Sequence, residues 1–105
     1  MSKLPKKVKI GPYDYAIVSL DKSDAKGNYG AFASEEQEIR LRESFKSPHM
    51  MADTLLHEIL HGIWFVHGIV ARDGEERVIS QMATGLTQVL RDNPDLVEFL
   101  RVNLK

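Results

Sequence analysis

The residues best suited to chemistry form one short run, His57-Glu58-Ile59-Leu60-His61. On an α-helix, side chains four residues apart lie one turn apart on the same face, so His57 and His61 would point at one metal ion. Glu58 lies about 100° around the helix from His57, where its carboxylate reaches a metal-bound water without binding the metal. Zinc lowers the pKa of such a water to about 7, and a carboxylate takes up its proton as the water attacks a carbonyl carbon. The spacing therefore predicts a zinc site with Glu58 as the general base.

A long helix must carry this motif. Ser47-Pro48 is typical of a helix start, with Ser47 as the N-cap, and the helix should end near His67, before Gly68. Its other residues are apolar on most sides, and such a helix is expected to be buried. Buried histidines and a buried glutamate need polar partners, which favours a metal site over two satisfied core histidines.

Strands are expected before this helix and helices after it. Residues 8–10, 13–20, 29–33 and 38–42 alternate or are rich in β-forming types, and they predict two hairpins in one small antiparallel sheet. Asp73 is the expected N-cap of a second long helix, and Asn93-Pro94 begins a third. This order predicts an α+β fold, and 105 residues suit one domain spanning residues 1–105.

The composition excludes several classes of function. The formal charge is −1 with acids and bases mixed, so no basic stripe indicates a nucleic-acid partner. No apolar run approaches the length of a membrane span. The sequence has no cysteine and no apolar leader segment, so we expect no disulfides, no cysteine-based zinc site and a cytoplasmic location. The oligomeric state is left open.

A catalytic zinc usually has three protein ligands, and a glutamate on the second helix is the favoured third. A glutamate there is favoured because that helix must pack on the motif helix and its first turn is expected near His61, and Glu76 is preferred to Glu75. The competing interpretation is structural. Asp73-x-x-Glu76 has the spacing of a capping box, and Glu75 would then be a solvated acid in the first turn.

His67 is the alternative third ligand. Its spacing from His61 reproduces the H-E-x-x-H-x-x-G-x-x-H pattern, but Trp64 stands where that pattern has the glycine that allows a sharp turn. If the helix continues, His67 lies about 120° around it and about 9 Å further along, too far to share the ion.

Supporting residues are less well determined by the sequence. Asp53 precedes His57 by one turn and is either an orienting partner of its ring or an ordinary exposed acid. Candidate donors to a developing oxyanion are His49, Tyr13, Tyr15 and Tyr29, and the sequence does not choose among them.

The motif with a following helix that begins Glu75-Glu76 resembles the gluzincin arrangement of zincin metallopeptidases. The compact form, and the segment from Gly85 to Pro94, resemble small cytosolic zincins of bacteria, phages and prophages. The resemblance covers residues 29–94. It implies His57, His61 and Glu76 as zinc ligands, Glu58 as the base, and an edge strand near residues 30–33 that holds an extended substrate by strand addition.

The expected function is a zinc-dependent metallopeptidase that hydrolyses a peptide bond in a protein or peptide substrate. Zincin peptidases usually carry further walls or a second subdomain around the substrate, and this chain has room for neither. The alternatives are a zincin-like binding module that recognises a protein partner without cleaving it, and a purely structural zinc site.

Overall fold

A four-stranded sheet forms the N-terminal part of the molecule. The structure, a computed structural model, describes residues 3–20 and 27–104. The strands are β1 (Lys7–Ile10), β2 (Tyr13–Ser19), β3 (Gly30–Ala33) and β4 (Glu38–Leu41), in the order β1-β2-β4-β3. β1–β2 and β3–β4 are antiparallel hairpins, which confirms the two predicted hairpins. β2 and β4 pair in parallel, so the sheet is mixed and not wholly antiparallel. The parallel pairing arises because the second hairpin places β3 on the outer edge and returns β4 beside β2.

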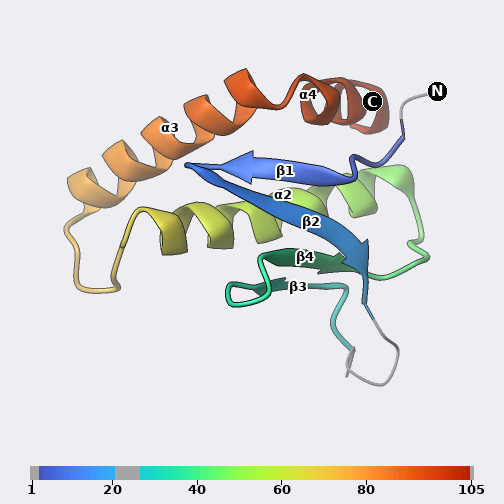
Figure 1. Ribbon diagram of the computed structural model, residues 1–105, viewed down its shortest axis with the longest axis horizontal. Helices are drawn as coiled ribbons and strands as arrows, with labels where there is room; N and C mark the ends of the chain where they lie inside the picture. The colour runs from blue at the N-terminus through green and yellow to red at the C-terminus, as the bar shows by residue number, and fades with distance from the viewer. Residues whose placement is uncertain (1–2, 21–26, 105) are drawn as a thin grey trace.

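Three helices follow, as predicted for an α+β fold: α2 (Pro48–Val66), α3 (Glu75–Asp92) and α4 (Pro94–Asn103). Ser47 caps α2 through a hydrogen bond from Met50 N, and Gly68 follows its end with a φ of 64°, as glycine readily does. All three helices lie on one side of the sheet, and α3 and α4 lie along its β1 edge (Figure 1). No helix in the described part of the chain is long and apolar enough to cross a membrane.

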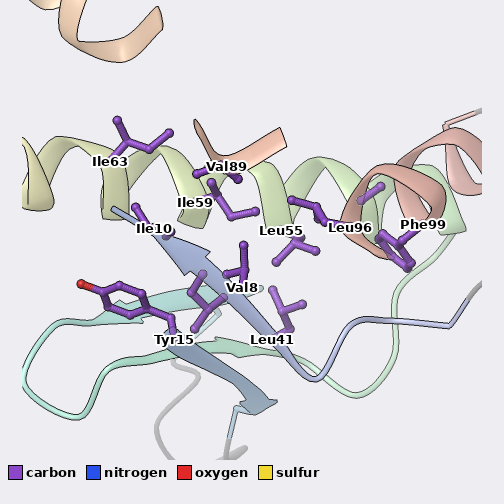
Figure 2. Packing of buried hydrophobic residues seen from close by; sticks show 12 residues of the cluster. Val8, Ile10, Tyr15, Leu41, Leu55, Ile59, Ile63, Val89, Leu96 and Phe99 are labelled. Carbon is purple, nitrogen blue, oxygen red and sulfur yellow. The ribbon is translucent and has the colours of Figure 1, made fainter. Parts of the chain in front are cut away.

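One hydrophobic core joins the sheet to the helices. Alternating strand residues such as Val8 and Ile10 are fully buried and meet Leu55, Ile59 and Ile63 of α2 (Figure 2). Val89 of α3 with Leu96 and Phe99 of α4 completes the cluster. The opposite face of the sheet carries polar residues such as Lys7 and Lys9, as expected for a sheet that is covered on one face only.

The motif helix is buried on one side only, so the prediction of a wholly buried α2 is wrong. Leu60, Trp64 and Phe65 are exposed, and so are both motif histidines. Their apolar neighbours do not enclose them because the sheet, α3 and α4 cover only part of the circumference of α2 (Figure 1). Because the two histidines are exposed, their ring nitrogens do not require a metal as a buried polar partner, and only Glu58 is buried as expected.

Side-chain amides bind the backbone at the C-terminal end of the β1 edge of the sheet. Asn93 accepts a hydrogen bond from Lys9 N and donates one to Lys9 O, and Gln88 accepts from Gly11 N and donates to Lys9 O. Asn93 also donates to Val89 O and is buried. These bonds satisfy backbone groups that an edge strand would otherwise leave open to another strand.

Candidate functional site

His57 and His61 lie one turn apart on α2 with their rings turned toward each other. Their Nε2 atoms are 3.2 Å apart, and the ring planes meet at 72°. Two nitrogens bound to zinc at about 2.0–2.1 Å with a tetrahedral angle lie about 3.3 Å apart. The histidine pair therefore fits two corners of a zinc tetrahedron, and both side chains are exposed.

Glu58 lies next to this pair and is the only charged residue buried in the described part of the chain, with an exposed fraction of 6%. Burial raises the pKa of the Glu58 carboxyl above its usual value, and the neighbouring His57 and His61 oppose this shift. A raised pKa brings a carboxylate closer to the range in which it both accepts and releases protons near neutral pH.

Glu58 faces the start of β3 at a point where the strand and the helix come close together. A Cβ on Gly30 would lie 3.1 Å from Glu58 Oε2 and 3.0 Å from Thr54 Cγ2, closer than an ordinary contact. Position 30 must therefore lack a side chain for the carboxylate to occupy its observed place. Nothing in the sequence indicated this role for Gly30, because it depends on a contact between distant segments.

β3 is an edge strand, and within the described residues it pairs with β4 alone. Arg42 N donates to Tyr29 O, and hydrogen-bonded pairs alternate along an antiparallel ladder. This alternation turns the N–H and C=O groups of Gly30 and Phe32 toward the open edge. The unpaired N–H and C=O groups of β3 therefore begin at Gly30, beside Glu58.

A polar pocket of about 220 Å³ lies between the start of β3 and α2. It is lined by Asn28, Tyr29, Gly30, Asp53, Thr54, His57 and Glu58. Tyr29 is held in place by Phe45, which stacks on its ring, and by the Arg42 guanidinium 4.3 Å from the ring centre. We call this cavity the polar pocket.

A second pocket of about 380 Å³ lies between α2 and α3. It is lined by His57, Leu60, His61, Trp64 and Met82, and we call it the apolar pocket. Met82 reaches it from α3, and no spacing in the sequence linked this residue to the motif. The two histidines therefore stand close to a polar cavity and an apolar one.

The structure does not bring Glu76 to the histidines. Gln81 of α3 contacts His67 at the end of α2, with 3.1 Å between His67 Nδ1 and Gln81 Oε1. Glu76 precedes Gln81 by five residues and His61 precedes His67 by six, and the two helices run in roughly opposite directions (Figure 1). At 1.5 Å per residue, Glu76 and His61 are therefore about 16 Å apart along the helices.

The cause is the connection between α2 and α3, which carries the chain past the end of α2 before α3 begins. The first turn of α3 therefore lies beyond α2 and not over its C-terminal half. The predicted capping by Asp73 is also wrong. Gly74 is the N-cap, without a side-chain hydrogen bond, while Asp73 accepts from Val70 N and pairs with Arg77. Glu75 and Glu76 are exposed acids of the first turn.

His67 also lies apart from the motif pair. The helix continues through Trp64, as expected from the missing glycine, and His67 is the C-cap residue. No group of three His, Cys, Asp or Glu side chains is arranged to hold a metal within residues 3–20 and 27–104. The identity of a third ligand stays a prediction.

The remaining candidate residues from the sequence lie in three places: at the polar pocket, in the core and on the surface. Asp53 and Tyr29 line the polar pocket. Tyr15 belongs to the core, where burial raises the pKa of its hydroxyl. His49 and Tyr13 are exposed and line neither pocket.

Comparisons of the chain with protein-family models, with curated proteins and with solved structures gave no match.

Proposed function

We propose that this protein is a zinc-dependent metallopeptidase that hydrolyses a peptide bond. The observation that carries the proposal is the pair of Nε2 atoms 3.2 Å apart with the buried carboxylate of Glu58 beside them. His57 and His61 are the residues that would hold the metal. When bound there, zinc would supply a Lewis acid that polarises a carbonyl and lowers the pKa of water.

Glu58 has the role of general base in this proposal. Its carboxylate takes up a proton as water attacks the substrate carbonyl and gives that proton to the leaving amine. Burial supports this role because it raises the pKa of the carboxyl and so makes the carboxylate a stronger base.

The substrate is proposed to bind in an extended form along β3. The open backbone groups of Gly30 and Phe32 suit main-chain hydrogen bonds to an added strand. The contrast between the two sheet edges supports this choice, since Asn93 and Gln88 bind the backbone at the C-terminal end of the β1 edge. The open edge also lies next to Glu58, so a strand added there would pass the base.

The partner in this proposal is a protein or peptide, and the location is the cytoplasm. The absence of cysteine suits a reducing compartment.

The test is Glu58→Gln, which keeps the shape of the side chain and removes its basicity. We expect hydrolysis of a casein or peptide substrate to fall by at least about 10²-fold while zinc remains bound, as measured by metal analysis after dialysis. His57→Ala and His61→Ala should lose both zinc and hydrolysis. Full activity of Glu58→Gln would refute the mechanism. Zinc binding by the unsubstituted protein without hydrolysis would refute the peptidase and favour the binding module.

Glu76→Gln tests the third ligand in the same assay. The helix arrangement described above predicts that this variant keeps its zinc affinity. Loss of zinc would instead support the sequence-based prediction, and α3 would then have to approach the histidines in the metal-bound protein.

A further inference from the structure

The two pockets beside the histidine pair differ in chemistry, and this difference bears on which peptides fit. Both pockets include His57, so side chains on either side of a carbonyl held at the histidines would enter different surroundings. The apolar pocket offers Leu60, Trp64 and Met82. The polar pocket offers the carboxylate of Asp53.

The apolar pocket suits a large aliphatic or aromatic side chain. Leu60 and Trp64 are 40% and 36% exposed, so they retain apolar surface that a ligand side chain would cover. The pocket volume of about 380 Å³ accommodates a leucine or phenylalanine side chain. Burying one such side chain contributes enough free energy for roughly a tenfold or greater change in affinity.

The polar pocket suits a positively charged side chain. Asp53 is exposed and forms no ion pair within the described ranges, so its charge is available at the pocket wall. A cation entering here is attracted by the charge of Asp53, whereas an anion is repelled.

The geometry points to a substrate with a large apolar side chain on one side of the reacting carbonyl and a lysine or arginine on the other. This inference names a substrate class for the proposed peptidase site, and therefore rests on that proposed function. The apolar side chain would contact Leu60, Trp64 and Met82, and the cationic one would contact Asp53.

Binding is measured without cleavage by using the zinc-loaded Glu58→Gln protein. Trp64 is the only tryptophan of the chain, so its fluorescence reports occupation of the apolar pocket. The probes are capped hexapeptides of alanine whose two central residues are Leu-Lys, Lys-Leu, Leu-Glu or Ala-Ala. We expect the better of the two leucine–lysine orders to bind about tenfold more tightly than Ala-Ala and about threefold more tightly than Leu-Glu.

Two further substitutions separate the pockets, each with a matched control. Leu60→Asn should remove the preference for leucine and keep that for lysine over glutamate. Leu90→Asn, at a leucine of α3 with nearly the same exposure (39%), should change neither preference. Asp53→Asn should remove the charge preference alone, whereas Asp14→Asn on the surface of β2 should leave it intact.

Equal binding of all four peptides would overturn the inference, as would equal effects of a pocket substitution and its control. Hydrolysis of the same peptides by the unsubstituted protein separates this outcome from failure of the proposed function. Cleavage without any preference refutes the inference and leaves the peptidase standing. Selective binding without cleavage refutes the peptidase and leaves the pocket assignment standing.

Discussion

Replacement of Gly30 by alanine tests the positioning of Glu58 without changing any polar group. The backbone of Gly30 lies outside the left-handed region, so alanine adopts it without strain. Its added methyl group would lie 3.0 Å from Thr54 Cγ2, 3.1 Å from Glu58 Oε2 and 3.2 Å from Arg40 O. Each distance is about 0.2–0.4 Å shorter than an ordinary van der Waals contact.

The size of the effect on activity depends on which of these three neighbouring atoms can move away from the new methyl group. Arg40 O is part of the sheet backbone, so the helix side, with the Glu58 carboxylate, must yield by about 0.3 Å. A misplacement of 1 Å costs about 10²-fold in rate, so this shift should lower kcat/KM about fourfold. Overpacking one methyl group should cost about 1 kcal/mol of unfolding free energy, partly offset by the better strand propensity of alanine.

The assay combines hydrolysis of a quenched fluorescent peptide with urea unfolding. Gly74→Ala is the matched control, because a Cβ there meets no atom within 4 Å. It should leave kcat/KM unchanged and alter stability by less than about 1 kcal/mol. If Gly30→Ala had the activity and the stability of the unsubstituted protein, the close approach of β3 to Glu58 would be refuted.

Four further outcomes are expected. The hydrogen bonds from Arg91 and Gln88 are the main cause that lowers the pKa of Asp92 from its ordinary value of 3.8 to about 2. The stability that Asp92 contributes is therefore fully present above pH 3.8 and is lost as the pH falls through about 2. In an NMR titration, Arg91→Gln should therefore move the Asp92 midpoint up toward 3.8. Gly85→Ala would drive a methyl group into Ile63 and should lower the unfolding free energy by about 1–2 kcal/mol in urea melts, despite the better helix propensity of alanine. Asn93→Ala removes three hydrogen bonds to backbone atoms and should cost about 3 kcal/mol in the same melts, and a cost below about 1 kcal/mol would contradict its structural role. Zinc at a hundredfold excess over its Kd should raise the unfolding free energy by about 2.7 kcal/mol, and chelation should reverse this gain.

Local patterns were sufficient to predict most of the fold. Ser47 and Pro48 marked the start of α2, and the strand segments were recognisable from alternation. The parallel pairing of β2 with β4 was missed because register between non-adjacent segments depends on the whole sheet.

The candidate site was predictable only where one helix supplies it. His57 and His61 are four residues apart on one helix, and the helix geometry itself brings their rings close together. The place of Glu76 depends on the path of the connection after α2, and no local signal reports that path. Gly30 and Met82 were missed for the same reason, because their roles come from packing between distant elements.

The unequal edges of the sheet limit how copies of this chain could associate. A sheet with two open edges can add neighbours on both sides and so grow without end. Here the amides of Asn93 and Gln88 bind the outer backbone of Lys9 in β1 and of Gly11 after it, and α3 contacts β1. Edge-to-edge pairing through β3 therefore stops at two chains, and a peptide bound at β3 would compete with that pairing directly.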